Sequence, residues 1–322
     1  MKKIITIAAI LLIATTSCDL NYLPYDGFPE SELFKSDIGI KGATVGNYNQ
    51  LKDAAYQRGF HFFGEYGGDN LSLSGPTRDH LIYCYNYEHF SSMGPTTYFW
   101  ESAYRLIVGC NKVIQAIDDN ASAEMKHLKG ENLFLRAQAL FHLSNCFGRP
   151  YYQSPETNLS VPIKLDDLMT TIPPRSTVKD VYNQVIADLL IAEQLMGSSK
   201  SNAYASKEVA QALLSRVYLY MSGTPEKPNQ EYAKKSIEYA DKVINSGRYS
   251  LIPTQDLKNY FTWAPESNKE TIFEVKHIVV DDRNLGAIGA LYNIVNGKGW
   301  GQLYPSQPMR ELIDQNPEDA RR

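Results

Sequence analysis

The sequence predicts a mainly α-helical protein, with a tetratricopeptide-like scaffold of helical repeats, long irregular loops and a few short strands. Apolar residues recur at spacings of three and four in several segments of the 322-residue chain, as they do on the buried face of a helix. These segments come as adjacent pairs, with small residues where two helices could pack closely, which is typical of helical repeats. An irregular helical domain is the alternative that periodicity alone leaves open.

The N-terminus has the features of a lipoprotein signal peptide. Lys2 and Lys3 precede an apolar run, residues 4–14, and small residues then lead to Cys18. The run is shorter than the roughly 20 apolar residues that span a bilayer. We expect residues 1–17 to be removed and Cys18 to be acylated, which would hold the protein on a membrane. An ordinary cleaved signal with an incidental cysteine is the alternative.

The next part of the chain carries little helical periodicity. Residues 19–36 are punctuated by prolines and a glycine and are expected to form a tether. A short helix is predicted over about 39–58. Residues 59–97 are rich in glycine, serine and aromatic residues without a steady period, so we expect long loops there.

Strong helical signals begin at residue 99. Apolar spacing predicts one helix over 99–117 and a second over 124–147, which stops at Gly148-Arg149-Pro150. Thr177 is expected to cap a helix that runs to about residue 195.

The remaining elements are shorter. Ser206 is expected to cap the next helix, and one more helix starts near residue 231 and ends at Gly247 as a left-handed cap. A strand is predicted over 270–275. Residues 281–308, rich in glycine, asparagine and aromatic residues, are expected to be irregular.

Charge and cysteine content exclude several classes of protein. The net charge of -4 and the pI near 5.9 argue against binding to nucleic acid, which needs a basic surface. With Cys18 assigned to lipid, Cys84, Cys110 and Cys146 are too few to form a disulfide framework. Cys110 and Cys146 sit in helical patterns and are expected to be small buried apolar residues, with a single bridge as the alternative.

The sequence also argues against an enzyme. The paired acids Asp166-Asp167 and Asp281-Asp282 are adjacent in sequence, whereas glycosidase acids come from separate elements that face one bond. They are therefore expected in solvated turns. The histidines show no zinc-binding spacing, and no phosphate-binding glycine loop or G-x-S-x-G motif is present. No metal and no cofactor is expected.

Two irregular segments carry the candidate ligand-binding residues, because loops on a rigid scaffold usually carry recognition. The first segment contributes Asp69, Asn70, Arg78, Tyr83 and Tyr85. The spacing of two at residues 83, 85 and 87 would put three tyrosine rings on one side of a strand. That side is either buried in the core or a platform on which a sugar stacks.

The second segment contributes Tyr292, Asn293 and Trp300. Gly297, Gly299 and Gly301 surround Trp300 and are expected to let the backbone turn sharply there. Few bulky neighbours would shield this indole, so an exposed stacking ring and a buried ring are both open. Stacking on one ring contributes about 1–2 kcal/mol, by analogy with other aromatic contacts. Two or three rings and a few hydrogen bonds would give micromolar to millimolar affinity.

Four polar residues on the helices are interpreted as structural. Arg136 lies near the apolar face of its helix and needs acceptors such as acids or loop carbonyls, and Glu131 lies just over one turn earlier. Arg216 repeats this situation on a later helix. Asn111, on a packed helical seam, is expected to be a structural hydrogen bonder rather than a ligand.

Six ordered motifs resemble those of the SusD/RagB family. Gly130-Glu131-Asn132-Leu133-Phe134-Leu135-Arg136-Ala137, continuing to Phe147-Gly148-Arg149-Pro150, resembles its "E-x-x-F-L-R-A … F-G-x-x-P" segment. The other five matches lie around Trp100 to Ile114, Pro174 to Leu189, Ser206 to Leu219, Ala240 to Leu251, and Asn268 to Glu274.

The resemblance implies a SusD-like α/α superhelix and a non-enzymatic function. Members of this family are lipid-anchored nutrient-binding proteins of the outer membrane that face the cell surface. They bind oligosaccharides, in some cases peptides, and pass them to a SusC-like TonB-dependent transporter. In the same two regions the family carries ligand-binding aromatic residues. A purely structural surface lipoprotein or a peptide-binding relative is the alternative.

The resemblance also implies a domain organisation. Residues 18–222 would form a SusD-like N-terminal region with helical repeats and aromatic loops. Residues 223–322 would hold the last repeat helix and the start of the family's C-terminal region, which is expected to be incomplete because family members are substantially longer.

Overall fold

The computed structural model describes residues 29–74, 81–168, 170–198, 200–281, 284–294 and 296–321. The predicted signal peptide, the predicted acylation site Cys18 and the candidate ligand residue Arg78 lie outside the described residues. Within the described ranges, none of the helices combines the length and the apolar character that a membrane span requires.

The described chain is mainly helical, as predicted, with three two-stranded antiparallel sheets among the residues placed. The helices and strands, in chain order, are α2 (Glu30–Leu33), α3 (Asp37–Gln50), α4 (Ala54–Glu65), β1 (Leu71–Leu73), α5 (Leu81–Tyr85), α6 (Gly94–Ala116), α7 (Ala123–Phe147), β2 (Leu159–Pro162), β3 (Arg175–Thr177), α8 (Val178–Leu195), α9 (Lys207–Met221), β4 (Gly223–Thr224), β5 (Lys227–Pro228), α10 (Gln230–Asn245), α11 (Gly289–Tyr292), β6 (Leu303–Pro305) and α12 (Gln307–Asp314).

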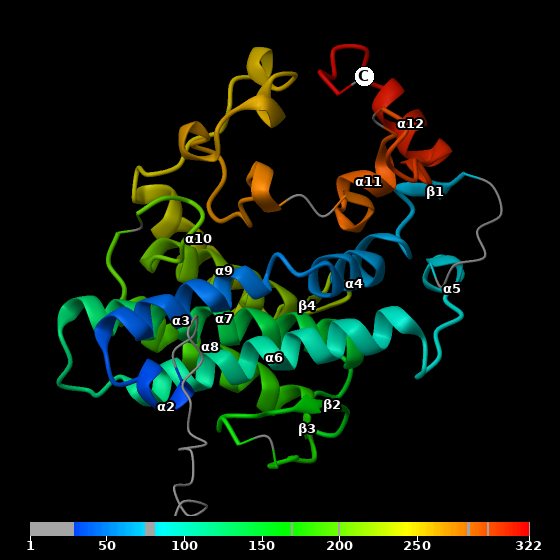
Figure 1. The fold of residues 1–322 in the computed structure, drawn as a ribbon. Coiled ribbons are helices and arrows are strands. Elements are labelled where there is room, and N and C mark those ends of the chain that lie inside the picture. The colour runs from blue at the N-terminus through cyan, green and yellow to red at the C-terminus, as the bar shows by residue number, and fades with distance from the viewer. Residues whose placement is uncertain are drawn as a thin grey trace, which may run out of the picture.

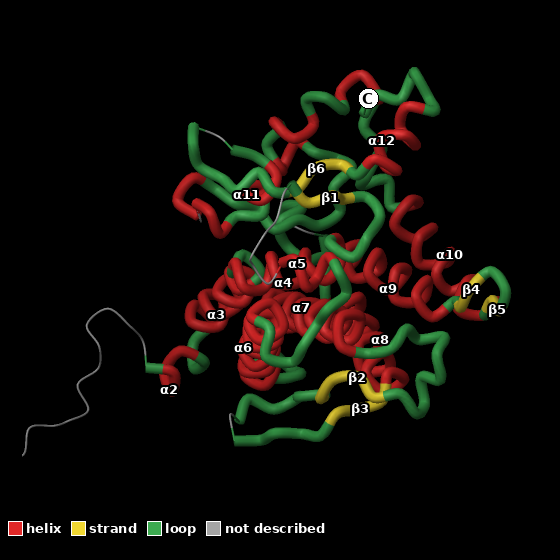
Figure 2. Tube along the Cα trace, turned by 90° about the vertical axis from the view of Figure 1, so that its right-hand side faces the viewer, coloured by secondary structure: helices red, strands yellow, loops and turns green. Residues whose placement is uncertain are grey.

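The long helices form one layer, with α7 at its centre. This helix packs against α6 on one side and α8 on the other, and α8, α9 and α10 follow as successive neighbours. Of the 25 residues of α7, 15 are buried, so it is enclosed on nearly all sides. The β2–β3 pair lies below the helical layer, and the chain after α10 lies above it together with β1 (Figures 1 and 2). This succession of packed helices confirms the predicted repeat scaffold.

Local sequence signals set the helix ends. The Thr177 hydroxyl accepts a hydrogen bond from the Asp180 amide at 3.1 Å at the start of α8. The Ser206 hydroxyl accepts one from the Val209 amide at 3.3 Å at the start of α9. Gly247, with φ of 66°, follows the end of α10 in the left-handed conformation. These predicted caps are confirmed.

The prediction for residues 39–97 was wrong in two respects. The single helix expected over 39–58 is two helices, because the Asp53 carboxylate accepts a hydrogen bond from the Ala55 amide at 2.8 Å and starts α4. The expected long loops contain most of α4, together with β1, α5 and the start of α6. Gly59 lowers the helix propensity of this segment, so α4 was not predicted. A glycine is nevertheless required at this position, because a Cβ would lie 2.6 Å from Phe99 Cβ on α6.

The strand predicted over 270–275 is not formed. The segment has no strand partner within the described residues and is held by single contacts instead. The Glu274 amide donates to the Asn202 carbonyl at 3.0 Å, and the Phe273 ring packs edge-on against Phe134 at 5.2 Å. These contacts anchor an irregular, half-buried segment on the helical layer.

The three cysteines of the described chain are free thiols. Cys84 and Cys110 are buried and Cys146 is half-buried. Burial raises the pKa of the Cys146 thiol to about 12, so it stays protonated and unreactive at neutral pH.

Candidate functional site

Pairing between distant strands brings the two predicted ligand-binding segments together. β1 and β6 run antiparallel, with Leu71 opposite Pro305 and Leu73 opposite Leu303. Beneath them a small apolar cluster joins α4, α5, α11 and β6, separate from the main core. Its buried members are Phe62, Tyr66, Leu81, Cys84, Met93, Leu291 and Leu303. Segments more than 200 residues apart in sequence therefore form one surface.

Asp69 and Asn70 hold this junction through their backbones. The Asp69 carbonyl accepts a hydrogen bond from the Ser306 hydroxyl, and the Asn70 carbonyl accepts one from the Ser306 amide at 2.9 Å. Both residues are exposed. Their side chains therefore remain at the surface, next to the start of α12.

The tyrosines at 83, 85 and 87 do not form a platform. Residues 81–85 form α5, where positions two apart point in widely different directions, so a common ring face cannot form. The Tyr83 ring packs edge-on against Phe90 at 5.3 Å, and the Tyr87 hydroxyl donates to the Gly67 carbonyl. The strand assumed for this stretch was wrong because its period of two reflects a short helix followed by a turn.

The second segment separates its aromatic residues. The Tyr292 hydroxyl is hydrogen-bonded to His61 Nε2 at 2.7 Å, which turns this ring towards α4. Asn293 is exposed. Trp300 keeps 45% of its surface exposed while its indole nitrogen donates to the Leu285 carbonyl at 3.0 Å. Trp300 is thus an indole fixed in position with part of its ring open to solvent.

Glycines shape the loop that presents Trp300. Gly297, Gly299 and Gly301 all have positive φ, between 55° and 122°. A Cβ at Gly299 would lie 1.9 Å from the Asn293 carbonyl oxygen, so a side chain cannot fit there. The sharp turns predicted from these glycines are confirmed.

A large cavity lies next to this surface, between α4, α7, α9 and the chain around 275–289. Its volume is about 860 Å³, and a second cavity of about 540 Å³ shares Phe60, Gly64 and Tyr220 with it. We call the two together the aromatic trough. His61, which binds Tyr292, lines the trough, and so does Gly289, at the start of α11. The trough is therefore continuous with the element that carries Tyr292.

The polar groups of the trough are mostly neutral. The His142 ring stacks on Phe60 at 3.9 Å, and its Nδ1 lies 3.1 Å from the Tyr56 hydroxyl. Burial, with a smaller effect from the Arg216 charge, lowers the pKa of His142 to about 3. The Asp281 carboxylate forms an ion pair with Lys52, at 2.7 Å from Lys52 Nζ. A trough of aromatic rings with few free charges suits a ligand with apolar faces and hydroxyl edges.

One amide in the trough has no partner. The Gln138 side-chain oxygen is shut off from solvent and accepts no hydrogen bond from the residues that the structure describes. A buried acceptor without a donor costs about 1–3 kcal/mol, so a donor group of a ligand or a water would stabilise it. Sequence analysis missed Gln138 and also His61, His142 and Tyr220, because each belongs to a helix whose periodicity gives no sign of a cavity.

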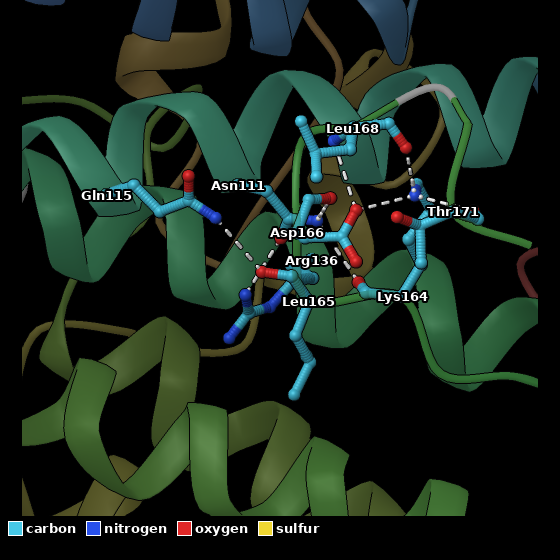
Figure 3. A network of polar contacts seen from close by, with 8 residues as sticks. All are labelled: Asn111, Gln115, Arg136, Lys164, Leu165, Asp166, Leu168 and Thr171. Atoms are coloured by element: carbon cyan, nitrogen blue, oxygen red, sulfur yellow. Dashed lines mark hydrogen bonds and ion pairs between the residues drawn. The ribbon is translucent and has the colours of Figure 1, made fainter. Parts of the chain in front are cut away.

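The predicted structural residues behave differently from one another. Arg136 is 6% exposed and makes a two-point ion pair with Asp188 on α8, at 2.8 and 2.7 Å. Its third contact is to the Asn111 side-chain oxygen at 2.8 Å. Asn111 in turn donates to the carbonyls of Lys164 and Asp166 at 3.1 and 2.7 Å (Figure 3). One guanidinium thus joins α6, α7, α8 and the loop after β2.

The same loop is held by a buried lysine. Lys164 Nζ donates to the Asp166 carboxylate at 2.8 Å and to the carbonyls of Leu168 and Thr171 at 2.7 and 2.9 Å (Figure 3). Asp166 is therefore engaged in closing a turn, which is the role expected for it. Among the described residues, no group of three potential metal ligands gathers anywhere.

Glu131 is buried but does not bind Arg136. Its carboxylate lies 3.2 Å from His127 Nε2. Because His127 Nδ1 accepts a hydrogen bond from the Gly197 amide at 3.1 Å, the proton of a neutral His127 ring sits on Nε2 and faces the carboxylate. Arg136 takes its acid from a neighbouring helix instead.

The prediction for Arg216 was wrong. Arg216 is exposed and forms no hydrogen bond or ion pair with any residue placed by the structure. It shares the outward face of α9 with Leu219 and Tyr220, while Leu214, Val217 and their neighbours face the core. The charge of Arg216 nevertheless contributes to the low pKa of His142.

Residues 40–219, more than half of the chain, match the SusD-like family model described as starch-binding and associating with the outer membrane. A SusD-like protein from Bacteroides ovatus is 23% identical over 86% of this chain and 50% of its own length. The chain thus spans about half the length of this curated relative.

Solved structures show the same fold. A SusD superfamily protein from Bacteroides thetaiotaomicron is 27% identical, with a TM-score of 0.77 over 88% of this chain and 62% of its own. A structure solved with a xylogluco-oligosaccharide has a TM-score of 0.68 at 19% identity, over 85% of this chain and 55% of its own.

Proposed function

Because the chain belongs to the SusD-like family of starch-binding, outer-membrane-associated proteins, we propose that it captures an oligosaccharide at the cell surface and delivers it to a TonB-dependent transporter. The observation that carries the ligand class is the aromatic trough beside an exposed, fixed indole. Sugar rings have apolar faces that stack on aromatic side chains and hydroxyl edges that hydrogen-bond, so they match such a lining.

The proposed contacts fall into two groups. Trp300 and the exposed side chains of Asp69, Asn70 and Asn293 would bind one part of the ligand at the surface joined by β1 and β6. Tyr220, 49% exposed, and the unpaired amide of Gln138 would bind another part within the trough. We no longer propose Tyr83 and Tyr85 as a stacking pair, since α5 separates their directions.

The proposed location follows from the N-terminal sequence and the family. Acylation of Cys18 would anchor the protein in the outer membrane, and the sequence between Cys18 and α2 would act as a tether. The SusC-like transporter as partner is carried over from the family resemblance. Weak binding suits a protein that must release its ligand to such a partner.

Calorimetric titration of the chain from residue 19 against neutral glycans, with soluble starch and xyloglucan oligosaccharides included, tests the ligand class. Trp300→Ala and Tyr220→Ala should each remove about 1–2 kcal/mol, a five- to thirtyfold loss of affinity. Tyr152→Ala is the matched control, because that ring is 53% exposed but lines neither cavity of the trough.

Two results would contradict the proposal. Equal losses in all three variants would mean that the effect is not specific to the trough. Absence of binding to every glycan, with peptides bound instead or nothing bound at all, would favour the peptide-binding or purely structural alternative.

A separate experiment tests the lipid anchor. Labelled palmitate should be incorporated into the protein, and Cys18→Ser should abolish this incorporation.

A further inference from the structure

A second groove, on the other side of the segment that closes the trough, has an unpaired acid in an aromatic setting. It has a volume of about 660 Å³ and lies between α3, the turn 201–204 and the chain at 266–278. We call it the α3 groove. Three rings meet at its wall: Tyr48 lies edge-on to Tyr204 at 5.2 Å and 6.5 Å from Phe273.

All charged residues that line the α3 groove form ion pairs, except one carboxylate. Lys52 is bound to Asp281 at 2.7 Å, and Lys276 is bound to Glu266. Glu274 makes no side-chain hydrogen bond or ion pair within the described ranges, and its Oε1 is shut off from solvent. One oxygen of this half-buried acid therefore lacks the partner that burial normally requires.

The groove is open on its α3 side. Gly42 and Gly46 lie one turn apart on the exposed face of α3, and nothing lies within 4 Å of the position that a Cβ would take at either residue. The opposite wall is fixed, because the Glu274 amide is bonded to the Asn202 carbonyl at 3.0 Å. A ligand can therefore approach along the exposed backbone of α3 and meet the carboxylate of a residue whose own backbone is anchored.

We propose that the α3 groove binds the ammonium group of an amino sugar, with Glu274 as its counter-ion and the rings of Tyr48, Tyr204 and Phe273 around it. A cation gains from a partly desolvated carboxylate and from the electron-rich faces of aromatic rings at once. Lys200 Nζ lies 5.8 Å from the centre of the Tyr204 ring, so this ring already has one cation contact, made by a residue that does not line the groove. The sugar part of the assignment rests on the proposed function; the ammonium part does not.

The test is calorimetric titration with the glucosamine tetramer at low salt and pH 6.0, where the amino groups of the tetramer are protonated. Glu274→Gln should weaken binding at least tenfold, and Gly46→Leu, which fills the groove, should abolish it. Glu156→Gln, an exposed acid elsewhere, should change nothing. The N-acetylglucosamine tetramer, which lacks the charge, should not bind in the α3 groove. Circular dichroism of each variant verifies that the fold is intact.

The pH dependence gives a second readout. Burial, and then the nearby Glu266, raise the pKa of Glu274, while Lys276 opposes the shift. Once the amino groups of the glucosamine tetramer are fully protonated, a further decrease in pH should protonate Glu274 and weaken binding, starting at a higher pH than for an ordinary glutamate. The Glu274→Gln variant should lose this dependence.

Several results would overturn the inference. They are unchanged affinity in Glu274→Gln, unchanged affinity in Gly46→Leu, or equal binding of the acetylated tetramer. Equally tight, Glu274-dependent binding of trilysine would overturn the sugar assignment. Failure of the proposed function looks different: neutral glycans would not bind, or would ignore Trp300→Ala and Tyr220→Ala, while the glucosamine tetramer would still require Glu274.

Discussion

Replacing Asp188 with asparagine should destabilise the fold far more than the loss of a surface ion pair. Asp188 is 1% exposed, and both of its carboxylate oxygens bind the Arg136 guanidinium, which is itself 6% exposed. The substitution removes the negative charge and leaves a buried cation with only Asn111 and one amide oxygen as acceptors. Because Arg136 joins α6, α7 and α8, the effect should reach the centre of the helical layer.

The expected magnitude is about 3–5 kcal/mol, the usual cost of removing one partner of a buried ion pair. That is a large part of the 5–15 kcal/mol by which proteins are typically stable. Lys179→Ala is the matched control. Its ion pair with Glu156 spans 3.5 Å between exposed side chains, so its loss should cost about 0–1 kcal/mol.

Urea unfolding followed by far-ultraviolet circular dichroism measures both losses. A loss below about 1 kcal/mol in Asp188→Asn, or one equal to that of Lys179→Ala, would refute the reasoning from burial. Replacing Arg136 with methionine and Asp188 with leucine together should recover much of the loss, since no unpaired charge then remains. If the double variant were as unstable as the single one, packing rather than charge would be the cause.

Three further predictions concern local features. In thermal unfolding, Gly299→Ala should destabilise the Trp300 loop, because the new Cβ would lie 1.9 Å from a carbonyl oxygen. The control is Gly64→Ala, within α4 and with open space around it, which should stabilise the protein by about 0.5–1 kcal/mol. Thr177→Ala should cost about 1 kcal/mol through loss of the α8 cap, while a Thr177→Ser variant that loses as much would argue against the cap as the cause. Burial lowers the pKa of His142 to about 3, so the unfolded chain binds one more proton than the folded chain between about pH 6.5 and pH 3. The stability that His142 contributes is therefore full above pH 6.5 and is lost on acidification, at up to about 1.4 kcal/mol per pH unit. His142→Phe should flatten this part of the stability profile, and an unchanged profile would contradict the assignment.

Local sequence signals predicted the structure correctly where the conformation depends only on residues a few positions apart. The hydroxyls of Thr177 and Ser206 bond amides three residues ahead, and Gly247 takes up its backbone conformation without help from distant parts of the chain. The repeat helices were predictable for the same reason, since their apolar spacing is a local property. The glycines around Trp300 likewise predicted the turns observed.

Predictions failed where contacts between residues far apart in sequence determine the structure. The signal for α4 was hidden by Gly59, which is required only because α6 crosses there. Residues 270–275 have the composition of a strand but meet a helical layer and a turn rather than another strand. Arg136 was expected to need an acid, yet nothing local indicates that the acid is Asp188, 52 residues away, or that Arg216 faces solvent.

The sequence by itself determined the helical-repeat class, the helix caps and the family, because these depend on periodicity and on motifs of a few residues. Only the tertiary structure joined the loops at 69 and 300 through β1 and β6. Only the arrangement of α4, α7, α9 and the chain around 275–289 created the aromatic trough. A cavity is a property of surfaces that meet from distant parts of the chain. Neither Gln138 nor Glu274 carries in its own neighbourhood any sign that its partner is missing.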